Sequence, residues 1–434
     1  MVKITFMGAG STVFAKNVLG DCLCTPSLKD AVIALYDIDE ERLKESEMML
    51  KSINKNSNDN RATILSYLDR KEALRGAKYV VNAIQVGGYD PCTITDFEIP
   101  KKFGLRQTIA DTLGIGGIFR ALRTIPVMLD FAKDMEEVCP DAWFLNYTNP
   151  MSMVTLAMLK GSKIKTVGLC HSVQVCAKTL LEGIELDVNE DSLETKIAGI
   201  NHMSWLLTIA QDGKDLYPQI KQLALDKGAP KDNQIRFELM KQFGYYVTES
   251  SEHNAEYLPY FIKNSHPELI ERFNIPLDEY PRRCINQIAS WNTQKEALIG
   301  DEKLQHTRSH EYASYIMEAM ETNIPYKIGG NVLNTGLITN LPDDCCVEVP
   351  CLVDRSGVTP TYVGKLPEQL AALNRTNINV HLLTVEAALT LKREYIYYAA
   401  MLDPHTSAEL TIEEIKQMCD ELIIAHGDYL PTYQ

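Results

Sequence analysis

The chain has 434 residues, of which 45% are hydrophobic and 23% are charged, and its formal net charge is −15. This length exceeds that of one typical domain, so we expect two domains with a large core. This negative net charge would repel the phosphate backbone of a nucleic acid, so a nucleic acid is disfavoured as a partner.

Cysteine usage and the N-terminal sequence favour a reducing compartment. The 11 cysteines are odd in number and no two form a C-x-x-C pair, which disfavours a zinc ribbon or a thioredoxin-type site. The opening residues, MVKITFMGAG, are too short an apolar run for a signal peptide, and no stretch has the apolar length that spans a bilayer. We therefore expect a cytoplasmic protein with free thiols and no membrane partner.

The first half of the chain alternates strand and helix signals. Short apolar runs typical of strands occur at 3–7, 31–36, 79–84, 143–146 and 165–169, and helical patterns occur at 12–22 and 40–51. This alternation predicts an α/β fold over residues 1–195, in which a Rossmann-like, doubly wound parallel sheet carries helices on both faces.

The pattern changes after residue 196. Helical segments around 232–244, 307–321, 379–402 and 412–425 mix with short strands such as 346–351. We expect residues 196–434 to form a second, α+β domain that serves substrate binding, catalysis and oligomerisation.

A glycine turn follows the first strand and opens the first helix. Gly8 can make the tight turn, Gly10 lets a pyrophosphate approach the backbone, and the helix N-terminus offers free N–H groups. Asp37 ends the second strand, where a carboxylate can accept both ribose hydroxyls of NAD and would repel the 2′-phosphate of NADP. The alternative for Asp37 is a helix cap. We assign Gly8, Gly10, Ser11, Asp37 and Gln85 to NAD binding.

Polar clusters follow the later strands, where ligands bind in doubly wound folds. Asp111 and Asn149 belong to two of them, and Cys170 with His171 ends an apolar strand. A thiolate and an imidazole from separate segments could share one divalent metal, so Cys170 and His202 are candidate ligands. The alternative is that both are ordinary core residues.

The segment 244–257 is dense in groups that transfer protons. Glu252, His253 and Tyr257 could each act as a base if burial or a metal tuned the pKa. The alternative is a solvated helix start, with Thr248 and Ser250 as caps.

These motifs, in this order along the whole chain, resemble glycoside hydrolase family 4, and most closely its α-galactosidase branch. The motifs include ITFMGAGSTVFAKN, QVGGYDP, QTIADTLGIGGIFRALRTIP, LNYTNPM, VGLCHSVQ, AGINHM and GYYVTESSEHNAEY. The resemblance implies a second domain of the lactate/malate dehydrogenase type. It also implies a manganese-type ion on Cys170 and His202, with Asn149 contacting the substrate beside it.

The resemblance implies a redox-assisted hydrolysis of terminal α-galactosides, an exception to chemistry with two carboxylates. NAD takes a hydride from C3, the metal polarises the ketone, a base removes the C2 proton, the aglycone leaves, water adds, and the hydride returns. We expect His171 to protonate the leaving group, and Glu252 or Tyr257 to be the base. Asp111 and Arg283 are further candidate substrate contacts.

Several alternatives stay open. A sister α-galacturonidase or α-glucosidase of the same family is the strongest, followed by an NAD-linked hydroxy-acid dehydrogenase and a non-catalytic NAD-binding protein. His171 replaces the acidic residue or Asn that typically follows the metal cysteine in the phospho-glycosidase branch, which argues against a 6-phosphorylated substrate. The resemblance also implies a homodimer or homotetramer.

Overall fold

The strands of the first half pair in parallel around β1. In the computed structural model, which describes residues 1–300 and 303–434, β1 pairs with β2 and β4, β2 pairs with β3, and β5 joins β4 to β6. The elements of this half are β1 (Lys3–Met7), α1 (Thr12–Cys24), β2 (Val32–Tyr36), α2 (Glu40–Asn58), β3 (Thr63–Tyr67), α3 (Arg70–Leu74), β4 (Tyr79–Asn82), α4 (Ile94–Lys102), α5 (Gly114–Val138), β5 (Trp143–Asn146), α6 (Met151–Gly161), β6 (Lys165–Leu169) and α7 (Ser172–Gly183).

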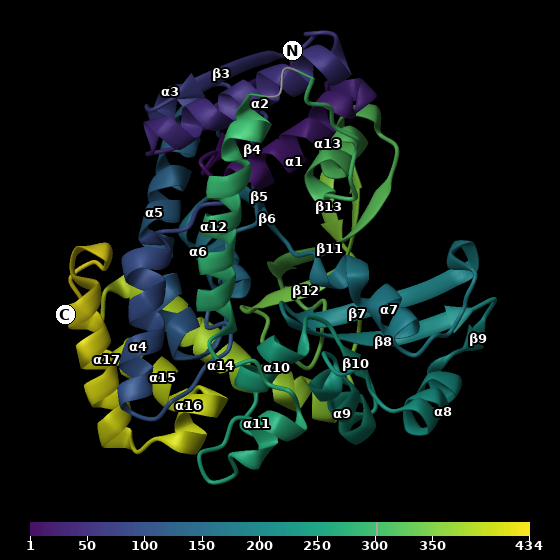
Figure 1. The fold of residues 1–434 in the computed structure, drawn as a ribbon, viewed down its shortest axis with the longest axis vertical. Helices are drawn as coiled ribbons and strands as arrows, with labels where there is room; N and C mark the ends of the chain where they lie inside the picture. Colours follow the sequence, from purple (N-terminus) through teal and green to yellow (C-terminus); the bar gives the residue numbers. More distant parts are fainter. Residues whose placement is uncertain (301–302) are drawn as a thin grey trace.

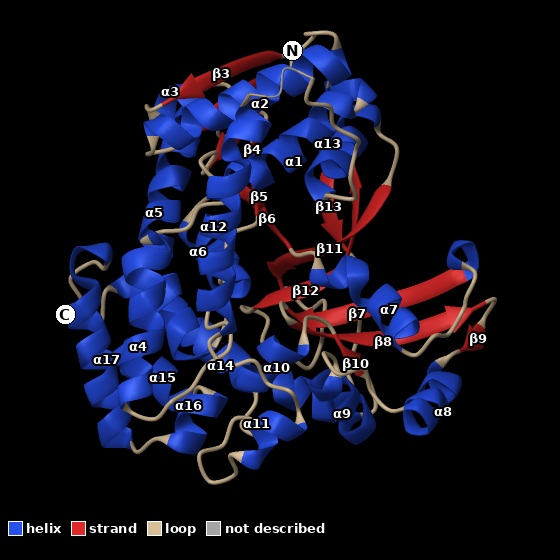
Figure 2. Cartoon of the chain, viewed as in Figure 1, coloured by secondary structure: helices blue, strands red, loops and turns tan. Residues whose placement is uncertain are grey.

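The central strands β1, β4 and β5 are buried because helices cover them, as their continuous apolar runs predict. Ile4, Phe6 and Val81 are completely buried in the main core. The expected Rossmann-like α/β class is confirmed, and Figure 2 shows helices beside the strands of both halves.

The second half adds antiparallel strands to the same sheet. Its strands are β7 (Leu193–Ile200), β8 (Met203–Gln211), β9 (Lys214–Asp215), β10 (Tyr246–Val247), β11 (Tyr326–Leu333), β12 (Cys346–Asp354) and β13 (Gly357–Pro360). Its helices are α8 (Tyr217–Lys227), α9 (Gln234–Phe243), α10 (Ser251–Tyr257), α11 (Glu268–Arg272), α12 (Glu279–Ile299), α13 (Tyr312–Thr322), α14 (Glu368–Thr390), α15 (Glu394–Leu402), α16 (Pro404–Glu409) and α17 (Ile412–His426).

One hydrogen-bonded sheet therefore crosses both halves of the chain. Its strand order is β10-β8-β7-β12-β11-β6-β5-β4-β1-β2-β3, and β11 pairs antiparallel with β6 at the seam (Figure 1). A Cβ on Gly168, in β6, would lie 2.8 Å from the Cβ of Asn331, in β11, so this glycine permits the close approach of the two strands.

Several elements differ from the sequence-based expectation. The predicted helix at 379–402 is two helices, because Leu391 adopts a left-handed conformation (φ +59°) that ends α14. Strand β3 and helices α5 and α12 were not predicted. Figure 1 shows α12 extending from the region of α10 to α2, and Cys284 is its one buried residue among those described. No helix in the described ranges is long and apolar enough to cross a bilayer.

Candidate active site

A cavity of about 390 Å³ opens at the carboxyl ends of β4, β5 and β6. Parallel sheets bind ligands at this edge because loops and helix N-termini converge there. The second half closes the cavity from the other side with residues of the β7–β8 turn, of the loop before α10 and of α12. Its polar lining includes Gln85, Asp111, Asn149, Cys170, His171 and His202.

The glycine turn has the geometry of a dinucleotide-binding loop. Gly8 is left-handed (φ +86°), and a Cβ there would lie 2.9 Å from the carbonyl oxygen of Ala83. The amide of Gly10 donates to Asp37 Oδ2 at 2.6 Å, and a Cβ on Gly10 would lie 2.8 Å from that oxygen. A side chain at position 10 would therefore collide with the carboxylate of Asp37, and it would also obstruct a phosphate that approaches the turn.

The helix-capping alternative for Asp37 is wrong. The side chain of Asp39 caps α2 by accepting from the amide of Arg42, whereas Asp37 stands two residues earlier. At the start of α1, Ser11 makes no side-chain capping bond and the first turn carries no acidic residue. A helix start of this kind leaves its N–H groups available to a phosphate, so these residues fit NAD.

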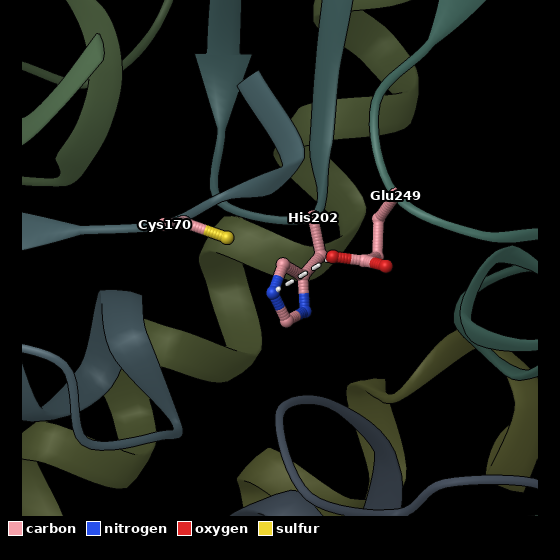
Figure 3. A group of neighbouring side chains, drawn as sticks. All are labelled: Cys170, His202 and Glu249. Carbon is pink, nitrogen blue, oxygen red and sulfur yellow. Dashed lines mark ion pairs between the residues drawn. The ribbon is translucent and has the colours of Figure 1, made fainter. Parts of the chain in front are cut away.

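Cys170, His202 and Glu249 form a group that fits a divalent ion. Their ligand atoms all lie within 4.8 Å of one another, and Figure 3 shows the ring of His202 between the thiol and the carboxylate. Cys170 follows β6, His202 lies in the two-residue turn between β7 and β8, and Glu249 precedes α10. A thiolate, an imidazole and a carboxylate together suit a borderline divalent transition metal such as Mn²⁺.

Neighbouring groups orient the ring of His202 for this role. Its Nδ1 lies 3.1 Å from the phenol of Tyr257, and its Nε2 lies 3.4 Å from Glu249 Oε2. Burial lowers the pKa of His202, but the Cys170 thiol and the Glu249 carboxylate outweigh burial and raise it to about 10. The site therefore favours positive charge, as a cation site must.

A buried carboxylate supports the turn that carries His202. Glu348 accepts from Asn201 Nδ2 at 3.3 Å, from Ser204 Oγ at 2.8 Å and from Asn331 Nδ2 at 3.0 Å. His202 itself has a positive φ of +63°. Because this conformation is unfavourable for a residue with a Cβ, the network stabilises the orientation that the metal site needs.

Glu249 is a site residue that the sequence-based assignment missed. Its side chain is 21% exposed and its φ is +61°. Burial raises the pKa of Glu249, but His253 and His202 outweigh burial and lower it to about 2. Its position within the proton-transfer segment 244–257 was visible in the sequence, but its approach to Cys170 was not.

Asp111 and Asn149 lie together in the cavity, as expected of substrate contacts. Asn149 Nδ2 donates to Asp111 Oδ2 at 3.4 Å, and Thr112 Oγ1 donates to Asp111 Oδ1 at 2.8 Å. His253 also lines the cavity, and its Nδ1 lies 2.6 Å from Ser250 Oγ. These groups place several hydrogen-bonding atoms in the same cavity as the candidate metal group.

His171 lines the cavity and is paired with a carboxylate. Its Nε2 lies 2.6 Å from Glu311, which immediately precedes α13. The hydrogen bond to Glu311 raises the pKa of His171, and burial opposes this shift. The pair can therefore hold a proton at the edge of the cavity.

Of the residues expected for catalysis or substrate binding, three do not line the cavity, and neither do the expected NAD residues Gly8, Gly10, Ser11 and Asp37. Glu252 forms an ion pair with Arg283 at 2.5 Å, and both side chains lie outside the lining. Tyr257 is completely buried behind His202. Tyr257 is therefore better placed to orient the metal ligand His202 than to remove a proton from a sugar carbon in the cavity.

Tyr280 lines the cavity instead, and the sequence-based assignment missed it. Its phenol oxygen accepts from Arg120 Nη1 at 3.2 Å. Burial raises the pKa of Tyr280, and the guanidinium of Arg120 opposes that shift. The two residues are 160 positions apart, so no local motif could have paired them.

The fold and the site define a class: a Rossmann-type protein with a dinucleotide-type glycine turn after β1 and a candidate divalent-metal group in a cavity at the carboxyl ends of β4, β5 and β6. Two family models match the chain, "Family 4 glycosyl hydrolase" over residues 3–186 and "Family 4 glycosyl hydrolase C-terminal domain" over 197–406. The chain belongs to glycosyl hydrolase family 4, which confirms the resemblance.

Curated and solved relatives support this membership. An α-galactosidase of Bacillus subtilis (strain 168) is 63% identical, with 100% of both chains covered. A putative glucosidase from Bacillus subtilis has a TM-score of 0.88 at 25% identity, covering 97% of this chain and 99% of that one. A 6-phospho-alpha-glucosidase from gut microorganisms, solved in complex with NAD and Mn²⁺, has a TM-score of 0.83 at 19% identity, with 100% of both chains covered.

A more distant likeness concerns the fold alone. Malate dehydrogenase from Cryptosporidium parvum has a TM-score of 0.55 at 14% identity, and the match covers 90% of this chain and 99% of that one. The expected lactate/malate dehydrogenase type of architecture is confirmed.

Proposed function

We propose that this protein hydrolyses terminal α-galactosides and that it uses NAD and a divalent ion, Mn²⁺, to do so. The single observation that carries the proposal is the Cys170, His202 and Glu249 group, which lies in a cavity that Phe14 of α1 and Gln85 also line. The 63% identity to an α-galactosidase over the whole chain supports the choice of sugar.

The bound groups would supply what the side chains lack: NAD a reversible hydride acceptor, and the divalent ion a Lewis acid at the sugar. Cys170 and His202 would hold the ion, with Glu249 beside them. Gly8, Gly10, Ser11, Asp37 and Gln85 would bind the dinucleotide. Asp111 and Asn149, which line the cavity, would bind substrate hydroxyls.

We propose Tyr280 as the base that removes the C2 proton. It lines the cavity, and the adjacent guanidinium of Arg120 would stabilise its phenolate. Glu252 and Tyr257 are weaker candidates, because the first is paired with Arg283 and the second supports His202.

His171 would protonate the leaving oxygen, with Glu311 as its partner. Both side chains come from segments that meet at the cavity edge, where an aglycone would leave.

Release of p-nitrophenol from p-nitrophenyl α-D-galactopyranoside tests the function. The assay would be run with and without NAD and Mn²⁺, under reducing conditions and after bound cofactors are stripped. We expect release only when both are added. Release without either would overturn the proposal in favour of a conventional hydrolase.

The Tyr280→Phe variant tests the base. We expect kcat to fall by about 100-fold or more, because a positioned base typically contributes at least that factor. Tyr260→Phe is the matched control, since Tyr260 is 49% exposed and lies outside the cavity lining. Full activity of Tyr280→Phe together with a large loss in Glu252→Gln would return the assignment to Glu252.

A sister α-galacturonidase is the second candidate, and Arg120 favours it. This guanidinium lines the cavity, is 7% exposed, and has Tyr280 as its hydrogen-bond partner within the described residues. A buried cation could bind the C6 carboxylate of a galacturonide. Inhibition by galacturonate but not by galactose would select this reading.

We further propose a cytoplasmic homodimer or homotetramer. All 11 cysteines are free thiols, which supports a reducing compartment. Ile285 and Ile288 of α12 are 52% and 45% exposed, which supports cover by a second copy. Light scattering on the purified protein would measure the mass, and a monomer would contradict this proposal.

A further inference from the structure

Glu256 is a buried carboxylate that accepts from three consecutive backbone amides. It lies in α10 and is 2% exposed. The amide of Thr108 donates to Oε2 at 2.8 Å, the amide of Ala110 donates to Oε1 at 2.8 Å, and the amide of Ile109 lies 3.3 Å from both oxygens. A carboxylate in this arrangement satisfies the amides of a loop that has no helix or strand of its own.

The loop needs this support because its backbone is strained. Ala110 adopts a left-handed conformation, with φ +51°, although it carries a Cβ. The loop also packs tightly on α5. A Cβ on Gly116 would lie 2.6 Å from the Cβ of Ala110, and one on Gly117 would lie 2.7 Å from the carbonyl carbon of Thr112.

The same loop determines where two cavity residues lie. Asp111 directly follows Ala110 and lines the cavity. On its other side, the loop accepts from the segment that begins α12: the amide of Asp278 donates to Gln107 O at 2.9 Å, and the amide of Tyr280 donates to Thr108 O at 3.0 Å. Tyr280 therefore takes its position from the loop.

We propose that Glu256 is a positioning residue that fixes Asp111 and Tyr280 in the cavity through the loop at 107–111. The carboxylate holds the strained loop, the loop presents Asp111, and its carbonyl groups anchor the start of α12. The importance of this arrangement for catalysis rests on the proposed function, in which Asp111 contacts the sugar and Tyr280 removes the C2 proton.

The test is the variant Glu256→Gln in the full-length protein. Its amide nitrogen would place a donor against backbone donors, so the loop loses part of its support. We expect hydrogen exchange to accelerate at the amides of Thr108, Ala110 and Tyr280, and kcat/KM for the α-galactoside to fall by about 100-fold. The kinetic isotope effect of a substrate deuterated at C2 should rise, because a displaced base makes proton removal slower.

Two further variants separate positioning from a general loss of folding. Glu256→Asp keeps two acceptor oxygens and should recover part of the activity and of the exchange protection. Glu409→Gln is the matched control, because Glu409 accepts from the amide of Asn264 at 2.8 Å and does not line the cavity. It should lose stability at most, with the isotope effect unchanged.

The outcomes are distinguishable. Unchanged exchange at Thr108, Ala110 and Tyr280 in Glu256→Gln would overturn the proposal, and so would accelerated exchange with wild-type kcat/KM and isotope effect. A wild-type protein that lacks galactosidase activity would refute the proposed function. The exchange data alone would then decide whether Glu256 holds Asp111 and Tyr280.

Discussion

At the scale of single residues, the site is built from side chains on strained backbone. His202 and Glu249 both have positive φ values, +63° and +61°, and each contributes to the candidate metal group. Neither residue is a glycine, so each conformation is unfavourable by itself and is maintained by the surrounding structure. Hydrogen bonds to Tyr257 and Glu348 are part of that support.

Removal of a metal ligand should abolish metal binding and leave the dinucleotide loop intact. We expect Cys170→Ser and His202→Ala to lower Mn²⁺ affinity by more than about 100-fold, beyond the usual effect of losing a supporting residue. Titration followed by electron paramagnetic resonance would measure the affinity. Cys176→Ser is the matched control, because this buried thiol lies near Arg236 and outside the cavity. Wild-type Mn²⁺ affinity in either ligand variant would refute the metal assignment.

Asp37→Ala should weaken NAD binding by about 10- to 150-fold, because a hydrogen bond to a charged group contributes about 1.5–3 kcal/mol. The variant also removes the acceptor of the Gly10 amide. Calorimetric titration with NAD measures the effect, and Asp39→Ala is the control, since it removes the α2 cap two residues away. Equal losses of affinity in the two variants would contradict a direct role for Asp37.

The sequence predicts those site residues whose place beside a strand or a glycine-rich segment brings them to the cavity, and it does not predict those that tertiary packing brings there. Cys170 and Asn149 follow strands and Asp111 precedes a glycine-rich segment, and the structure brings all three to one cavity. Tyr280 and Glu249 could not be found in this way, because each reaches the cavity through tertiary packing of a loop or helix start. For the same reason, the sequence could not show that Tyr257 lies behind His202.

At the scale of elements, the strands buried on both faces were the most predictable. Runs such as VIALY and YVVN are apolar throughout, as central parallel strands require. Strand β3, TILSY, was missed because it is an edge strand with polar positions. Helix α12 was also missed; its sequence is polar on average, and Cys284 is the one residue that it buries among those described.

Helix α14 carries a buried histidine that should make stability depend on pH. His381 is 1% exposed, neither ring nitrogen has a hydrogen-bond partner among the described residues, and burial lowers its pKa from 6.5 to about 3. The unfolded chain binds a proton below pH 6.5 and the folded chain does not, so stability is lost as pH falls through this window. The loss approaches about 1.4 kcal/mol per pH unit.

Urea unfolding of His381→Leu at pH 7 and pH 5 measures this contribution. The variant should lose less stability on acidification than the wild type does. His266→Asn is the control, because its side chain is 62% exposed. Identical pH dependence in the His381 variant and the wild type would show that this histidine titrates normally.

At the scale of the whole molecule, the expected division at residues 195 and 196 is crossed by the sheet. Strand β6 of the first half pairs with β11 of the second, and β7 and β8 join through β12. We predict that residues 1–195 expressed alone will expose the edge of β6 and will aggregate. Chromatography of that fragment beside the full chain checks this, and a stable monomeric fragment would show that the halves fold independently.

The position of the metal group on this sheet links metal binding to the amount of folded protein in the cell. Cys170 follows β6 and His202 follows β7, so under the proposed function one ion bridges both halves of the chain. A ligand that binds only the folded state stabilises it by about 2.7 kcal/mol at one hundred times its Kd. Cells short of manganese would then hold less of the enzyme as well as a less active one, because metal-free chains unfold more often and are degraded.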